Sequence, residues 1–114
     1  MNMGIPKTIH ELKTWPEQFE LTNCGEKTLE LRREDDKKFQ PRDLLWLREY
    51  VPTDDEWHAR FGDEPNPYAD WIEVDPGTFT GEECWVWVSD VIRGWGLLPG
   101  WAALSVKRVQ LVAS

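Results

Sequence analysis

The amino-acid sequence predicts a mainly β (α+β) fold: a small antiparallel β-barrel with one or two short helices and a long acidic insert. Two observations support this class. Five short segments show the alternation of apolar and polar residues that is typical of strands. Most of them are joined locally, which favours a small barrel over a layered α/β domain. The 114 residues are enough for one hydrophobic core, so we expect a single domain over residues 1–114.

The expected strands lie at residues 7–12, 28–33, 44–50, 83–92 and 102–112. Side chains alternate between the two faces of a strand, so each segment also predicts which residues share a face. In the second strand, Leu29 and Leu31 should face the core, which leaves Thr28, Glu30 and Arg32 on an outward polar face.

A helix is expected between the first two strands. Thr14 can cap it, because Glu17 lies three residues later, where it completes a capping box, and Pro16 suits a first turn. The helix should end near Cys24, since Gly25 can adopt the left-handed conformation that ends many helices.

Residues 51–79 form the acidic insert. Residues 51–83 contain ten acids and a single base, Arg60, whereas the whole chain has a net charge of −8. The acidity therefore belongs to one segment, and the remainder is close to neutral. Within the insert, Thr53 and Glu56 predict a second capping box, and Trp57 and Phe61 lie four residues apart, where they could pin a short helix to the body.

The most informative stretch for function is Gly25-Glu26-Lys27-Thr28-Leu29-Glu30-Leu31-Arg32. Side chains two residues apart on one face of a strand lie about 7 Å from each other, so an ammonium, a carboxylate and a guanidinium should converge. Such a patch can read a base, because the carboxylate accepts from an exocyclic amine and the cations bind carbonyl or phosphate oxygens. The alternative is a surface strand with ordinary ion pairs.

A second candidate region is the junction between the first strand and the helix, at Lys13, Thr14 and Trp15. Free backbone N–H groups at a helix start can bind an anion. Trp15 could stack on a base there or belong to the core.

The motif Gly25-x-Lys27-x-x-Glu30-x-Arg32 resembles the GxKxxExR signature of ASCH domains, which are relatives of the PUA RNA-binding fold. The segment His10-Glu11-Leu12-Lys13-Thr14-Trp15-Pro16 is similar to that of an uncharacterised phage and bacterial branch of the superfamily. The resemblance covers residues 8–50 and, more loosely, 80–106. It implies a PUA-like barrel with a cleft between the first helix and the motif strand.

The sequence is compatible with three functions. The first is binding of a nucleotide, nucleoside or RNA element by Lys13, Thr14, Trp15, Lys27, Thr28, Glu30 and Arg32. The second follows from the resemblance: some ASCH-like proteins are amidohydrolases of acylated cytidine, for which Lys27 and Glu30 would be catalytic, although Glu30 stands where those enzymes have a threonine. The third is a phage-type protein-interaction factor that engages a host protein through the acidic insert.

Several classes of function are not expected. Cys24 and Cys84 are isolated, without metal-ligand spacing, so we expect no metal site, and nothing in the sequence indicates a cofactor. The sequence shows neither a signal peptide nor an apolar stretch of membrane-spanning length, which predicts a cytoplasmic protein without a membrane partner. The oligomeric state stays open.

Overall fold

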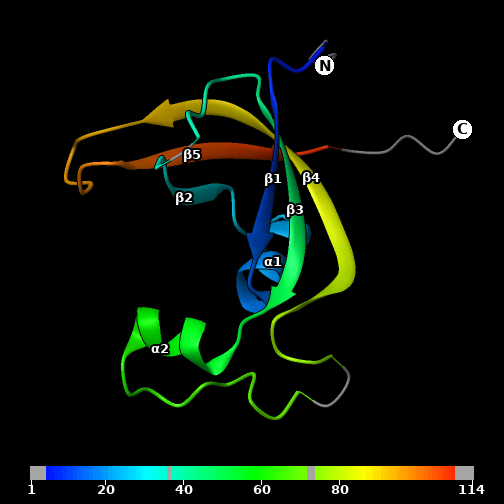
Figure 1. Cartoon of the computed structure of the whole chain (residues 1–114). Helices are drawn as coiled ribbons and strands as arrows, with labels where there is room; N and C mark the ends of the chain where they lie inside the picture. Colours follow the sequence, from blue (N-terminus) through cyan, green and yellow to red (C-terminus); the bar gives the residue numbers. More distant parts are fainter. Residues whose placement is uncertain (1–4, 36, 72–73, 110–114) are drawn as a thin grey trace, which may run out of the picture.

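A computed structural model describes residues 5–35, 37–71 and 74–109. It contains five strands and two helices: β1 (Ile9–Thr14), α1 (Pro16–Asn23), β2 (Leu29–Arg33), β3 (Leu44–Val51), α2 (Asp54–Phe61), β4 (Thr78–Ile92) and β5 (Trp101–Arg108). The strands form one curled sheet in the order β1-β3-β4-β5-β2 (Figure 1). The mainly β class with two short helices is confirmed. The predicted strand residues 110–112 lie outside the described residues.

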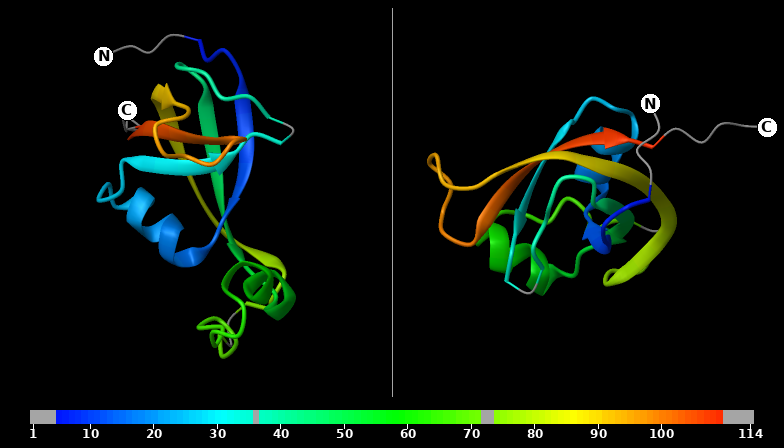
Figure 2. Two further views of the ribbon diagram at one scale, coloured as in Figure 1. Left: turned by 90° about the vertical axis from the view of Figure 1, so that its left-hand side faces the viewer. Right: turned by 90° about the horizontal axis from the view of Figure 1, so that it is seen from above.

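The pairing differs from a purely antiparallel barrel at one place. β1 and β3 run parallel, with Leu12 opposite Leu47, whereas the β3–β4, β4–β5 and β2–β5 pairs are antiparallel. The chain between β1 and β3 includes α1, and such a crossover returns the chain to the sheet in its original direction. β1 and β2 are left as the two edges of the curled sheet (Figure 2).

The hydrophobic core fills the concave side of the sheet. Leu45, Val88 and Leu104 are completely buried there, and Phe19 of α1 and Phe39 of the β2–β3 loop close the core from the open side. Burial of large apolar side chains of this kind is the main source of folding free energy.

A buried polar pair lies at one end of this core. His10 Nε2 is 2.9 Å from Asp43 Oδ2, both side chains are buried, and the imidazole packs on the Phe39 ring. Asp43 also accepts from the backbone N–H of Gln40, so this pair orders the turn that leads into β3.

The predicted orientation of β2 is wrong. Leu29 and Leu31 are about half exposed, at 46% and 52%, whereas Glu30 is 2% exposed. Glu30 lies opposite the buried Leu104 of β5, so it points to the concave side of the sheet. Alternation predicted correctly which residues share a face, but not which face is inside. The inner side of this edge strand meets the polar end of α1 rather than the apolar core.

The insert begins with α2, and its predicted capping box is present. Thr53 Oγ1 accepts from the backbone N–H of Glu56, and the Glu56 side chain accepts from the backbone N–H of Thr53. Trp57 and Phe61 of α2 lie against Trp15, with ring centres 5.7 and 6.1 Å away. The predicted attachment of the insert to the body is confirmed, and α2 lies apart from the sheet, below it in Figure 1.

The β4–β5 connection projects from the sheet, on the left in Figure 1. Gly94, Trp95 and Gly96 all have positive φ, at 77°, 51° and 88°, and the Trp95 side chain is 95% exposed. A bulky residue adopts this conformation only at a cost, which its two glycine neighbours do not incur.

Within the described residues, neither helix has the length and apolar character needed to cross a membrane.

Candidate functional site

Glu30 is the centre of the candidate site. Thr22 Oγ1 of α1 donates a 2.9 Å hydrogen bond to Glu30 Oε1, and Lys27 Nζ lies 3.3 Å from the same oxygen. Arg32 Nη2 lies 3.3 Å from the other oxygen, Oε2. Both carboxylate oxygens are therefore occupied, and a buried carboxylate held in this way orders the two cations beside it.

Arg32 connects the two edges of the sheet. Its Nη1 donates to the backbone carbonyl of Lys13 and its Nη2 to Thr14 Oγ1, each over 3.1 Å, so one β2 side chain bridges to the end of β1. Burial lowers the pKa of Arg32, Glu30 opposes that change, and the positive charge of Arg60 adds to the lowering. Arg32 Nε is one of two buried side-chain polar atoms that lack a hydrogen-bond partner among the described residues.

The two lysines of the site are held less tightly. Lys27 Nζ donates to Gln18 Oε1 over 2.7 Å, and the Lys27 side chain keeps 24% of its surface exposed. Lys13 is exposed, and its Nζ lies 4.5 Å from the centre of the Tyr50 ring. Both ammonium groups can therefore reach a ligand without unfolding any element.

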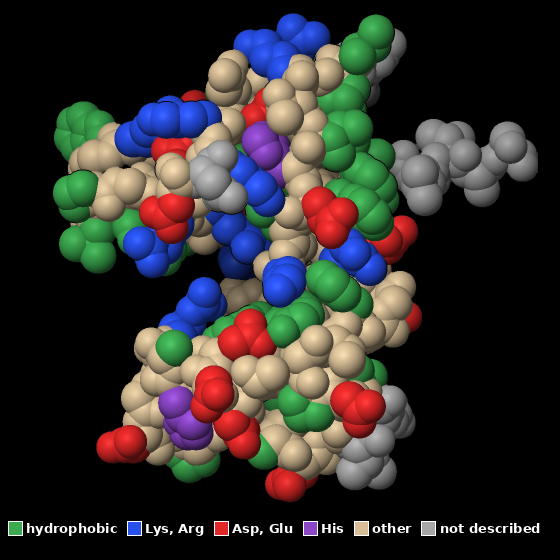
Figure 3. Space-filling model, in the orientation of Figure 1, with side chains coloured by type: hydrophobic (Ala, Val, Ile, Leu, Met, Phe, Trp, Pro, Cys, Tyr) green, Lys and Arg blue, Asp and Glu red, His purple; other side chains and the backbone are tan. Residues whose placement is uncertain are grey.

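Trp15 joins the site to the insert. One of its neighbours is the stacked ring of Trp57, and Arg60 Cζ lies 4.5 Å from the centre of the Trp15 ring. These contacts commit much of the indole to α2, so Trp15 serves first as the docking point of the insert. Figure 3 shows the result: a notch between the sheet and the α2 lobe, with Lys and Arg side chains on both sides.

The expected anion site at the start of α1 is altered by the insert. Trp15, not Thr14, occupies the N-cap position, and no side chain caps the helix there. Instead the backbone N–H of Glu17 donates to Tyr68 Oη over 3.3 Å. The predicted Thr14 cap is wrong, because Thr14 is the last residue of β1, one position before the N-cap, and its hydroxyl accepts from Arg32.

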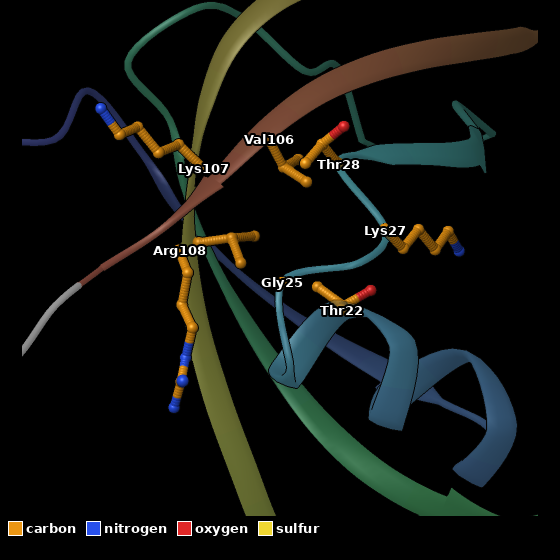
Figure 4. Close-up of a pocket in the computed structure, with 8 residues that line it drawn as sticks. Thr22, Gly25, Lys27, Thr28, Val106, Lys107 and Arg108 are labelled. Atoms are coloured by element: carbon orange, nitrogen blue, oxygen red, sulfur yellow. The ribbon is translucent and has the colours of Figure 1, made fainter.

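Thr28 lies away from the Glu30 cluster. It is exposed at the rim of a hollow of about 220 Å³, which is bordered by Thr22, Gly25, Lys27, Val106 and Arg108, among others (Figure 4). The Lys27, Lys107 and Arg108 side chains point in different directions there. Because its cations diverge, this hollow does not form a convergent anion site.

The structure thus brings together the side chains of Thr14, Lys27, Glu30 and Arg32, whereas Lys13 contributes its backbone carbonyl and its ammonium lies over Tyr50. Thr28 is exposed and shares with Lys27 only the rim of the 220 Å³ hollow. Sequence reasoning missed three contributors. Gln18 and Thr22 are ordinary helix residues without a distinguishing signal. Arg60 did carry one, since it is the only base in an otherwise acidic segment.

A second hollow, of about 400 Å³, lies between α1 and the insert. Three carboxylates and two aromatic rings surround it, with prolines beside them: Glu17, Glu20, Glu49, Tyr68, Trp71, Pro16 and Pro67. Its chemistry is opposite to that of the notch. Across residues 5–35, 37–71 and 74–109, no cluster of three His, Cys, Asp or Glu side chains is suited to hold a metal ion.

Comparison with known families places the chain in one of them. The model of a family described as a domain of unknown function, DUF3850, matches residues 9–106, and the chain therefore belongs to that family. The search of curated proteins found no match.

Proposed function

We propose that this member of the DUF3850 family binds a nucleotide, nucleoside or RNA element in the notch beside Lys27, Glu30 and Arg32. The observation that carries the proposal is the buried Glu30 carboxylate, which holds the two cationic side chains of Lys27 and Arg32 beside it. The resemblance of this motif to ASCH domains supports the same class of ligand. A cytoplasmic location, expected from the sequence, would suit it.

Preorganisation is the physical basis of the proposal. Arg32 is fixed by Glu30, Thr14 and the Lys13 carbonyl, so little side-chain entropy is lost when its remaining donors bind an oxygen of a ligand. A guanidinium of this kind suits the paired oxygens of a phosphate or the edge of a base.

Glu30 has a different role from the one expected of it. Because it is buried and both its oxygens already have donors, it positions the cations rather than reading an exocyclic amine itself. The readout would then come from Arg32, Lys27 and the more exposed Lys13.

Titration calorimetry with nucleosides, their 5′-monophosphates and short single-stranded RNA tests the proposal. Arg32→Gln should weaken binding by at least about tenfold, because a hydrogen bond to a charged group contributes roughly 1.5–3 kcal/mol. The matched control is Arg33→Gln. Arg33 is the next residue on β2, has a side chain 64% exposed, and pairs with the equally exposed Asp35. It should leave affinity unchanged.

Two further measurements keep the test informative if Arg32→Gln does not fold. Arg32→Lys keeps the charge but loses the planar fork, so it should fold and bind with intermediate affinity. Native mass spectrometry of the purified protein, followed by mass analysis of any released molecule, shows whether a ligand is retained and whether it is chemically unchanged. Equal loss of affinity in Arg32→Gln and Arg33→Gln, or no binding by the wild type, would refute the proposal.

A second candidate function rests on the 400 Å³ hollow. Carboxylates beside Tyr68 and Trp71, whose ring centres are 5.3 Å apart, favour a cationic side chain of a protein partner. Under that alternative, Glu17→Gln with Glu49→Gln would abolish partner binding, whereas Arg32→Gln would not.

A further inference from the structure

The acidic insert directs its single base toward the site. Arg60 lies on the last turn of α2 and stacks over Trp15, 4.5 Å from its ring centre. Trp15 directly follows Thr14, whose hydroxyl holds Arg32. Two guanidinium groups thus lie beside the junction of β1 and α1, one from the sheet and one from the insert.

Arg60 has no ion-pair partner within the described part of the chain. The acid one turn before it on α2 is Glu56, but that carboxylate accepts from Tyr50 Oη over 2.6 Å and from Thr53. Arg60 also adds to the positive potential that lowers the pKa of Arg32. The insert contains many carboxylates that could have neutralised Arg60, yet its guanidinium lies over the Trp15 ring.

The local charge therefore has the sign opposite to that of the whole molecule. Arg32 and Arg60 place two positive charges beside Thr14 and Trp15, and Glu30 supplies the negative charge that pairs with Arg32. The chain as a whole carries −8. Concentrating positive charge in a hollow of an acidic protein is favourable chiefly when an anion binds there.

We infer that the ligand carries a phosphate group, and that this group binds between Arg32 of the sheet and Arg60 of α2. The inference rests on the proposed nucleotide-type function and narrows it, since a bare nucleoside would leave the two guanidinium groups unneutralised. It also gives the insert a direct part in binding: α2 is the second wall of the site.

The test compares each nucleoside with its own 5′-monophosphate, and adds inorganic pyrophosphate as a probe without a base. Wild-type protein should bind the monophosphate at least about tenfold more tightly than the nucleoside, because a charge-assisted bidentate contact is lost in the latter. Arg60→Gln should remove most of that preference and weaken pyrophosphate binding, so that monophosphate affinity falls by a larger factor than nucleoside affinity. Arg60→Lys should retain part of the preference, and Arg33→Gln should retain all of it.

Structural damage is separated from loss of the contact by amide hydrogen exchange in α2, which should be the same in Arg60→Lys as in the wild type. If the wild type binds nucleoside and monophosphate equally, or if Arg60→Gln keeps the preference, the phosphate inference is overturned while nucleotide-type binding stands. If only pyrophosphate binds, and Arg60→Gln abolishes it, the anion site is supported and the nucleotide function fails. If no probe binds the wild type, both are wrong.

Discussion

Two carboxylates that neutralise arginines lie close together in the sequence on and just after β2. Glu30 supports the site, and Glu34 fastens the chain after the strand. Glu34 pairs with Arg93 through contacts of 2.6 and 2.8 Å, and it accepts from the backbone N–H of Phe39 over 2.8 Å. Because Phe39 covers the core, Glu34 couples the charged β2–β3 loop to core packing.

Glu34 should make folding stability depend on pH in the acid range. The hydrogen bonds from Arg93, against the opposing effect of burial, lower the pKa of Glu34 to about 2. A carboxyl with a depressed folded pKa stabilises the protein above its unfolded value, near 4.5, and loses that contribution as pH falls toward 2. Because Arg93 is partly exposed, solvent screens its interaction with Glu34. We therefore expect the unfolding free energy to fall by an amount on the order of 2 kcal/mol, which is less than the pKa change alone would give.

Urea unfolding of wild type and Glu34→Gln at pH 7, 4.5 and 3 measures this contribution. The difference in unfolding free energy between the two should be largest at pH 7 and shrink at pH 3. The exposed Glu26 serves as the control, because Glu26→Gln should follow the wild-type profile. A difference that is constant over this pH range would contradict the assignment.

At the scale of elements, the capping box of α2 has the clearest energetic consequence. Thr53→Ala removes a side-chain acceptor from the Glu56 N–H, and such a loss costs about 1 kcal/mol of helix stability. Hydrogen exchange of the α2 amides should therefore accelerate by roughly fivefold. Exchange in β3 and β4 should stay the same, and Thr8→Ala, at an exposed position before β1, should change neither. Equal acceleration in α2 and the sheet would show that the cap acts on the whole fold.

Elements whose signals are local could be predicted from the sequence. The end of α1 at Gly25 and the start of α2 at Thr53 each depend on a few neighbouring residues, and both were predicted correctly. The parallel β1–β3 pairing and the inside face of β2 depend on which strands become edges. That depends on contacts between residues far apart in sequence, which alternation does not encode.

Part of the candidate site could be predicted from local signals in the sequence, and part could not. Glu30 and Arg32 were predicted together because alternation places them on one face of a strand, and the turn at Gly25 was expected to bring Lys27 to the start of that strand. Trp15 and Arg60 come together only through the docking of α2, which brings together positions 45 residues apart in the chain.

At the scale of the whole molecule, the sheet and the insert should differ in stability. The sheet has a continuous buried core, whereas α2 contains no buried residue and attaches through the rings of Trp15, Trp57 and Phe61. Segments with few buried contacts open at lower free energy than the core. The two walls of the notch therefore belong to parts of different rigidity.

Trp15→Ala tests this division. It removes the shared partner of Trp57, Phe61 and Arg60, so exchange of α2 amides should rise by about tenfold or more, since aromatic pairs contribute roughly 1 kcal/mol each beyond burial. Core amides of β3 and β4 should change little. Trp95→Ala is the control, because its indole is 95% exposed and should affect neither part. A uniform rise across sheet and insert would mean that the two unfold as one unit.

The placement of β2 has a consequence for how the protein is made. β2 comprises residues 29–33, yet its strand partner is β5, at residues 101–108. During translation, β1, β3 and β4 can associate before β5 leaves the ribosome, but β2 has no ladder to join until β5 emerges. Arg32, whose side chain bridges from β2 to the end of β1, is therefore set in place late, and a nascent chain completes these contacts only after β5 has been synthesised.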